Sequence, residues 1–229
     1  MNHGEKVNAV EQAGAGVGKN SGITEQAEAH GKYTVECYGP AEKDRGRYAF
    51  LREAIGEAEK APFWRFLKKL RLPSLRKELN LIPIGLKWAD TIDNLVTTGG
   101  KNDALDKYLA GSAYTAAWYM GLISSTSYTT GVAAGDTMAA HGGWAEDQNY
   151  SEATRPAAAW SAASAGSKAM SSARTFSINA TTTIKGCFLA SNSTKGGTTG
   201  ILYSAGLFSG GDKAVANTDT LNVSYTASL

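Results

Sequence analysis

The residues at 14–19 are the first place where the sequence could support chemistry. They read Gly-Ala-Gly-Val-Gly-Lys, and glycines of this kind let backbone N–H groups approach phosphate oxygens. A Walker loop, however, needs a glycine where this chain has Ala13 and a Ser or Thr where it has Asn20, and no apolar strand precedes the string. We therefore expect a flexible arm here rather than a nucleotide site.

The titratable residues give no catalytic or metal-binding pattern either. His3, His30 and His141 are not spaced as metal ligands, and none is near a cysteine in sequence. The chain contains neither Gly-x-Ser-x-Gly nor His-Glu-x-x-His. Asp136 and Glu146 could meet as a carboxylate pair, but solvated loop charges are the preferred interpretation. We predict no catalytic residue, cofactor or metal, and we do not expect an enzyme.

Composition sets the class of protein that must position any site. At 229 residues the chain suits one ordinary domain with appendages and can bury a proper core. Cys37 and Cys187 are too few for a disulfide framework, so we expect two buried, reduced thiols. Residues 1–18 show no secretory signal, and no stretch reaches the roughly 18 apolar residues of a membrane span. These features predict a soluble chain made in the cytoplasm.

The N-terminal residues, 1–31, are rich in glycine and contain almost no large apolar side chain. Such a segment cannot bury enough surface to fold alone. We predict an extended arm that is ordered only where it lies on something else, such as a neighbouring subunit.

Two segments, residues 32–38 and 86–94, place side chains alternately on two sides, as half-buried strands do. The residues between them follow a different pattern. A turn at Gly39-Pro40 is expected to end the first one. The expected inward-facing residues are Tyr33, Val35 and Cys37 in the first strand, and Leu86, Trp88 and either Thr91 or Ile92 in the second.

The last third of the chain consists of short apolar runs between glycine-bearing turns. The runs lie at residues 175–178, 187–190, 201–208 and 221–226. Together with an apolar run at 115–123, they predict the strands of an antiparallel sandwich or barrel. Residues 124–156 form a long polar connection, and long connections are usually functional or interfacial.

One short helix is expected between these strand regions, over residues 103–110. Asn102 would be its N-cap, Asp103 and Asp106 would lie near its positive end, and Gly111 would stop it.

The region between the first two strands is basic and helical. Residues 41–87 contain 12 Lys or Arg against 6 Asp or Glu. We predict helices over 47–59 and 62–72, with Pro62 in the first turn of the second and a further turn at 75–79. The second helix has an apolar face by its i, i+3, i+4, i+7 spacing. Its predicted partner-binding residues are Phe63, Trp64, Phe66, Leu67 and Leu70.

Three interpretations fit this amphipathic helix. It could be a membrane-surface helix or a nucleic-acid patch. We favour a helix that docks its apolar face on protein, with basic residues in solvent, because amphipathicity is what any packed surface helix shows. We therefore expect neither a nucleic-acid nor a membrane partner.

Residues 86–125 carry a resemblance to a known kind of protein. They read LKWADTIDNLVTTGGKNDALDKYLAGSAYTAAWYMGLISS. Together with Arg155-Pro156, residues 186–189 and the ending at 219–226, this string resembles small structural proteins of tailed-bacteriophage virions. The resemblance covers about residues 32–40 and 86–229. Such proteins join the first two strands by a short turn, which a helical insertion replaces here, so the role of the insertion cannot be carried over.

These observations predict a mainly β protein with an antiparallel, jelly-roll-like β-sandwich. Its parts would be an N-terminal arm at 1–31, the sandwich at 32–40 and 86–229, and a basic helical insertion at 41–85. The resemblance implies a homo-oligomeric capsid decoration or cement protein of the virion, assembled in the bacterial cytoplasm, whose partners are the major capsid protein or other virion proteins. The alternative within the particle is a neck, tail or fibre component.

A carbohydrate-binding module is the alternative from another class. Trp144, Tyr150 and Trp160 could line a sugar platform, and sandwiches often serve that role. Exposure of these aromatic residues on one face would favour the module, whereas their burial would favour the structural protein.

Overall fold

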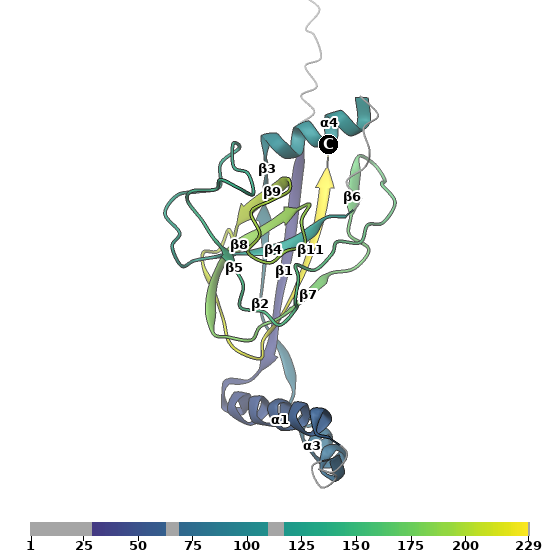
Figure 1. Ribbon diagram of the computed structural model, residues 1–229, viewed down its shortest axis with the longest axis vertical. Helices are drawn as coiled ribbons and strands as arrows, with labels where there is room; N and C mark the ends of the chain where they lie inside the picture. The colour runs from purple at the N-terminus through teal and green to yellow at the C-terminus, as the bar shows by residue number, and fades with distance from the viewer. Residues whose placement is uncertain (1–28, 63–68, 110–116, 229) are drawn as a thin grey trace, which may run out of the picture.

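The computed structural model describes residues 29–62, 69–109 and 117–228, and within them the chain forms two antiparallel sheets and three helices (Figure 1). The first sheet has the order β2-β1-β11-β6, with β7 also paired to β11; the second has the order β3-β9-β8-β4-β5, with β10 paired to β8. The strands of the first sheet are β1 (His30–Pro40), β2 (Ile84–Asp93), β6 (Ser167–Ala169), β7 (Arg174–Ser177) and β11 (Thr220–Ser228). Those of the second are β3 (Leu95–Val96), β4 (Tyr119–Ser124), β5 (Glu146–Asp147), β8 (Thr182–Ala190), β9 (Leu202–Leu207) and β10 (Lys213–Val215). The mainly β, antiparallel prediction is confirmed.

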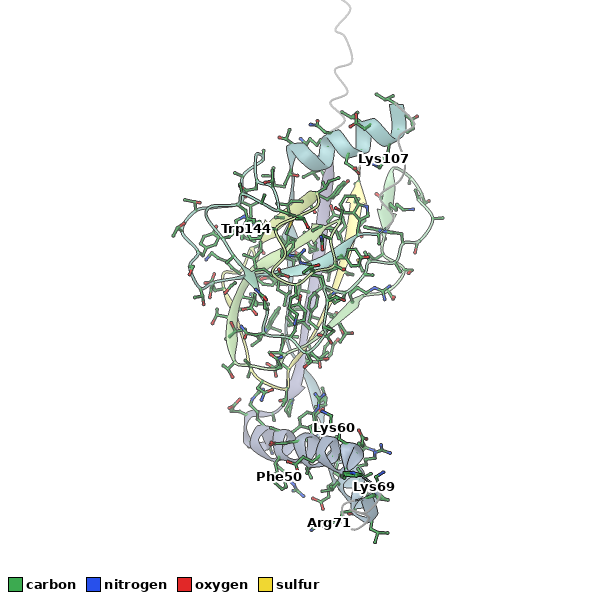
Figure 2. All side chains as sticks on the ribbon, viewed as in Figure 1. Phe50, Lys60, Lys69, Arg71, Lys107 and Trp144 are labelled. Carbon is green, nitrogen blue, oxygen red and sulfur yellow. The ribbon has the colours of Figure 1, made fainter. Side chains whose placement is uncertain are left out.

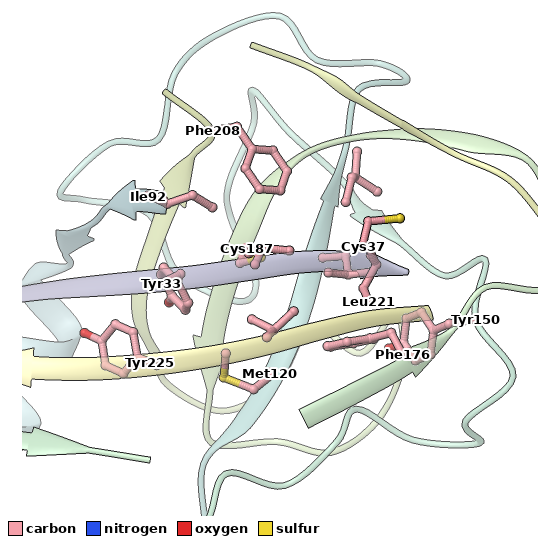
Figure 3. Close-up of a cluster of buried hydrophobic side chains, with 14 of the residues drawn as sticks. Tyr33, Cys37, Ile92, Met120, Tyr150, Phe176, Cys187, Phe208, Leu221 and Tyr225 are labelled. Carbon is pink, nitrogen blue, oxygen red and sulfur yellow. The ribbon is translucent and has the colours of Figure 1, made fainter. Parts of the chain in front are cut away.

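The main core lies between the sheets and is built by alternate residues of the long strands (Figure 3). In β1 and β11 the buried side chains face one another as cross-strand pairs: Tyr33 with Tyr225, Val35 with Val223, and Cys37 with Leu221. The inward face predicted for β1 is therefore confirmed. Tyr33 also joins the two sheets, because its hydroxyl lies 2.7 Å from the Ser204 hydroxyl of β9. Both cysteines are buried free thiols, as expected.

A second core cluster covers the outer face of the second sheet. Strand β8 is buried on both faces, since Cys187 belongs to the main core and Phe188 to the second cluster. Met138 and Trp144, from the 124–156 connection, complete the second cluster. The connection therefore serves as a structural cover for this sheet, in addition to supplying β5.

The strands predicted in the last third are confirmed in β7, β8, β9 and β11. The boundary of the arm is wrong, because β1 begins at His30, where it pairs with Ser228, and continues through Pro40. The strand predicted at 115–123 is β4, Tyr119–Ser124, and residues 115 and 116 lie outside the described residues. Residues 1–28, which hold most of the predicted arm and its glycine string, lie outside them as well.

Helix α4 (Thr98–Leu109) begins earlier than predicted. Its first turn is capped by Thr97, whose hydroxyl accepts a hydrogen bond from the Gly100 N–H at 3.0 Å, so Asn102 is inside the helix and not its N-cap. Gly100 packs against the backbone of Tyr203, where a Cβ would collide with the carbonyl oxygen. This tertiary contact explains a helix start at two glycines that local propensity disfavours.

Strands β1 and β2 form the predicted antiparallel pair, with Lys32 opposite Asp93 and Tyr38 opposite Leu86. Ile92 is buried as predicted and Trp88 is half-buried, but Leu86 and Thr91 are exposed. Leu86 was predicted to face inward, and this prediction is wrong. The register shifts between Cys37 and Tyr38, and beyond that point the two strands run past the sandwich, as Figure 1 shows.

The remaining helices lie between β1 and β2 at the end of this hairpin (Figure 1). They are α1 (Glu42–Lys60), longer at both ends than the predicted 47–59, and α3 (Leu72–Asn80), which contains the turn predicted at 75–79. Helix α4 lies at the opposite end of the long axis, beside the start of β1 and the end of β11. The molecule therefore presents helices at both ends of a β-sandwich.

Candidate interaction surface

The described residues of the helical insertion form only a very small core. Its buried apolar residues are Leu51 and Ala58 of α1, Ala61 and Ile82, whereas α3 buries none of its residues. Two helices held by so few buried side chains gain little hydrophobic stabilisation, since each fully buried large side chain contributes roughly 1.5–3 kcal/mol. The described part of the insertion therefore gains little stability from a core of its own.

Large apolar side chains are instead exposed on the insertion. Phe50 is 65 % exposed, Leu70 57 % and Leu81 73 %, and the exposed Ile84 and Leu86 continue this set along β2. We call these five residues the insertion surface. Single exposed apolar residues are normal, whereas apolar patches mark interaction sites, and we take this set of five as the candidate interaction surface.

A groove of about 210 Å³ opens beside Phe50, which is the residue of the insertion surface that lines it. It is lined by Phe50, Ala54, Glu57 and Ala58 from α1 and by Arg71 and Leu75. An engineered cavity of about 150 Å³ is enough to hold benzene. The groove can therefore accept an aliphatic or aromatic side chain of a partner.

Among the residues predicted to bind a partner, Leu70 is exposed and belongs to the insertion surface. Phe63, Trp64, Phe66 and Leu67 lie outside the described residues. Sequence reasoning missed Phe50, Leu81 and Ile84. The signal for Leu81 and Ile84 was present in the short apolar run at 81–84, but Phe50 gave none, because an apolar residue in a helix is usually assigned to a core.

Basic side chains are carried by the same helical insertion, and Figure 2 labels Lys60, Lys69 and Arg71 there. Arg47 pairs with Glu78 at 3.1 Å and Arg76 with Glu59 at 2.6 Å, and all four side chains are largely exposed. Exposed pairs of this kind contribute about 0.2–1 kcal/mol each. The cations of the insertion without an ion pair among the described residues are Lys43, Arg52, Lys60, Lys69, Arg71 and Lys77. The insertion thus combines apolar side chains with uncompensated positive charge.

A buried carboxylate attaches the insertion to the sandwich. Asp219, which is 1 % exposed, accepts hydrogen bonds from Arg45 of α1 at 2.9 Å, from Lys87 of β2 at 2.5 Å and from the Ala216 N–H at 2.9 Å. Arg45 also donates to the Asn217 carbonyl at 3.2 Å. One carboxylate therefore links α1, β2 and the turn before β11.

The same hydrogen bonds set the protonation of this group. Burial alone would raise the pKa of Asp219, but the bonds from Lys87, the Ala216 N–H and Arg45 outweigh it, so the pKa lies below its usual value. Burial and the neighbouring Asp219 charge raise the pKa of Cys37 to about 12. The Cys37 thiol therefore stays protonated near neutral pH, and its sulfur lies 3.8 Å from Asp219 Oδ2.

Beyond this carboxylate, α1 faces the sandwich across a polar cleft of about 420 Å³. The cleft is lined by Arg52 and Glu53 on the α1 side and by residues such as Ser151, Asn179 and Thr218 on the other. The insertion is thus held to the sandwich by polar contacts and by the two strands that lead into it, with little apolar packing.

Helix α4 gives a second exposed apolar surface at the other end of the molecule. Leu105, Tyr108 and Leu109 are exposed, and Figure 2 shows α4 with Lys107 far from the insertion that carries Phe50. We call these three residues the α4 surface. The protein therefore has two separate surfaces suited to protein contacts.

The carboxylates considered for chemistry have structural partners. Glu146 and Arg155 form a bidentate pair at 2.9 and 2.7 Å, almost completely buried. Arg155 also donates to the carbonyls of Asn192 and Gly197. This network fixes the 124–156 connection to the loop after β8.

Asp136 is engaged elsewhere, since it accepts a hydrogen bond from the Trp144 indole at 2.9 Å. His141 stacks on Trp144 and its Nδ1 lies 2.8 Å from the Trp144 carbonyl oxygen. Within the described part of the chain, no three His, Cys, Asp or Glu side chains are grouped so that they could hold a metal ion. The described helices are not both long and apolar enough to span a bilayer.

The aromatic residues of the carbohydrate alternative do not form an exposed platform. Trp144 and Tyr150 are buried, and the partly buried Trp160 packs edge-on against Tyr225.

Comparison of the chain with protein-family models and with curated proteins gave no match. The proposal for function therefore depends on the surfaces described above and on the resemblance of residues 86–125.

Proposed function

We propose that this chain is a structural subunit of a tailed-bacteriophage virion that decorates or cements the capsid, with its sandwich arranged as a jelly roll. The supporting observation is the insertion surface, which presents Phe50, Leu70 and Leu81 outside the sandwich on a basic helical element. The resemblance of residues 86–125 to virion proteins supports the particle, and the strand pairing across the insertion supports a sandwich that carries an added docking element.

The physical basis of such a role is mass action. A subunit that binds several neighbours at once stabilises the assembled shell relative to its separated parts. The insertion surface and the α4 surface lie at opposite ends of the long axis, so one molecule can contact two neighbours. These neighbours would be the major capsid protein, another virion protein or a further copy of this chain.

The test measures binding to shells that lack this protein, at two salt concentrations. Phe50→Ser with Leu70→Ser removes two exposed apolar side chains, and the matched control Lys69→Gln with Lys77→Gln removes two exposed charges. We expect the apolar changes to weaken binding at least about tenfold, because each buried large side chain contributes roughly 1.5–3 kcal/mol. The Lys changes should have a much smaller effect.

The opposite pattern would contradict the docking role. If the Lys changes abolish binding and added salt does the same to the parent protein, the association is driven by charge, as with nucleic acid or an anionic lipid surface.

A further inference from the structure

The charges of the chain divide by region in a way that points to the occupant of the insertion surface. Residues 41–85 contain eleven Lys or Arg against six Asp or Glu, whereas residues 1–28 contain four Glu against two Lys. Residues 86–229 are close to neutral, with nine Lys or Arg against ten Asp or Glu. The N-terminal residues and the insertion are therefore the two regions of opposite charge, and opposite charges favour and orient association.

The ends of β1 place these two regions at opposite ends of the molecule. β1 begins at His30, paired with Ser228 near α4, and ends at Pro40, which leads into α1 (Figure 1). Eleven residues of strand span roughly 36 Å. The acidic residues therefore join the sandwich at the end farthest from the basic insertion. When a second copy is placed head to tail, the acidic residues of one copy come beside the basic insertion of the other.

The acidic segment also has the reach and the side chains for this contact. Twenty-eight extended residues span at most about 90–100 Å. Among them Val7, Val10, Val17 and Ile23 are branched aliphatic residues in a sequence that otherwise consists mainly of small and polar residues. The groove between Phe50 and Leu75 is large enough to accept such a side chain, and it is lined by both Arg71 and Glu57, so the charge that attracts the acidic residues is that of the insertion as a whole.

We propose that residues 1–28 of one copy dock on the insertion surface of a second copy, so that copies associate head to tail. Such a contact joins different surfaces of the two partners, and it therefore continues into rings or filaments rather than closing as a two-fold dimer. This self-docking rests on the proposed function only in that the insertion is a docking surface. The partner is a second copy of the same chain.

The test is a complementation experiment in the full-length chain. The arm variant carries Glu5→Gln, Glu11→Gln, Glu25→Gln and Glu28→Gln, and the insertion variant carries Phe50→Ser with Leu81→Ser. Sedimentation velocity should show concentration-dependent association of the parent protein, weakened by added salt, and at least about tenfold weaker association of each variant alone. A one-to-one mixture should form heterodimers, because one intact arm and one intact insertion surface remain in each pair.

A charge exchange guards against an insertion variant that fails to fold. Lys69→Glu with Arg71→Glu should weaken association of the full-length chain, and adding Glu25→Lys with Glu28→Lys to the same chain should restore it. A parent protein that stays monomeric at all concentrations, or a mixture that does not recover association, overturns the proposal. If the parent is monomeric while the insertion variant still loses binding to shells, the self-docking inference fails and the proposed function stands.

Discussion

The sandwich and the helical insertion obtain their order in different ways. In the sandwich, long strands pair over many residues and bury complete side chains such as Tyr33 and Phe188, which are both 0 % exposed. In the insertion, α3 buries none of its residues and Phe50 stays exposed. One region therefore has a large buried core, and the described residues of the other leave apolar side chains exposed.

The largest expected difference between the two regions is seen when the same side chain is removed from each. Phe188→Ala should lower the free energy of unfolding by about 3–5 kcal/mol, because it leaves a cavity beside Trp144 in the second core cluster. Phe50→Ala should change it by less than about 0.5 kcal/mol, since that side chain is exposed. Urea unfolding of the two variants measures both values. Similar losses would show that the insertion contributes to the common core.

The second largest change in the free energy of unfolding is expected at Asp219, which links the insertion to the sandwich. Asp219→Asn should cost about 3 kcal/mol near neutral pH, because it weakens two hydrogen bonds from charged groups, Arg45 and Lys87. Asp93→Asn, at an exposed carboxylate of β2, is the matched control and should have little effect.

The stability difference between the parent and Asp219→Asn should also depend on pH. Because the folded pKa of Asp219 is lowered, the unfolded chain binds this proton more tightly than the folded one. The stabilisation is thus complete above the unfolded carboxyl pKa of about 3.9 and is lost as the pH falls through the folded pKa. Urea unfolding at a series of pH values from neutral to strongly acidic measures this difference. A difference that stays constant throughout would exclude Asp219 as its source.

Removal of the insertion should cost less than the loss of Asp219. If residues 41–85 are replaced by an Asn-Gly turn, β1 and β2 become a simple hairpin. We expect cooperative unfolding to persist, with a loss of about 1.5 kcal/mol for the hydrogen bonds from Arg45 to the Asp219 turn. Loss of the cooperative transition would mean that the insertion belongs to the sandwich core.

The smallest effect is expected for an ion pair within the insertion. Arg47→Ala removes the exposed pair with Glu78 and should change the free energy of unfolding by about 1 kcal/mol or less. Chemical denaturation at low and high salt measures this change. A larger loss would show that α1 and α3 are held together mainly by charge.

The strands of the sandwich could be predicted because their signal is local. Alternation placed Tyr33, Val35 and Cys37 inward, and the short apolar runs of the last third became β7, β8, β9 and β11. The start of α4 could not be predicted, because Gly99 and Gly100 disfavour a helix. The helix starts there because Gly100 packs against Tyr203, a residue that is distant in sequence. Leu86 was misplaced because its pattern continues that of the buried residues, although the strand has not yet entered the core at this point.

The candidate site was predictable only in part for the same reason. The basic character of 41–85 and its helices were visible in composition and spacing. The exposure of Phe50 and the contacts of Asp219 with Arg45 and Lys87 depend on how β1, β2 and β11 bring distant residues together. No local pattern encodes such contacts.

Amide hydrogen exchange tests the central claim most directly, which is that the insertion is a docking element carried by an independently stable sandwich. In the dilute, unassembled protein, amides of α1 and α3 should exchange far faster than those of β1, β8 and β11, because local opening of the insertion exposes little apolar surface. On assembly, the amides of α1 and α3 should become protected. Equal protection of helices and sheets in the unassembled protein, or no change in α1 and α3 on assembly, would contradict this account.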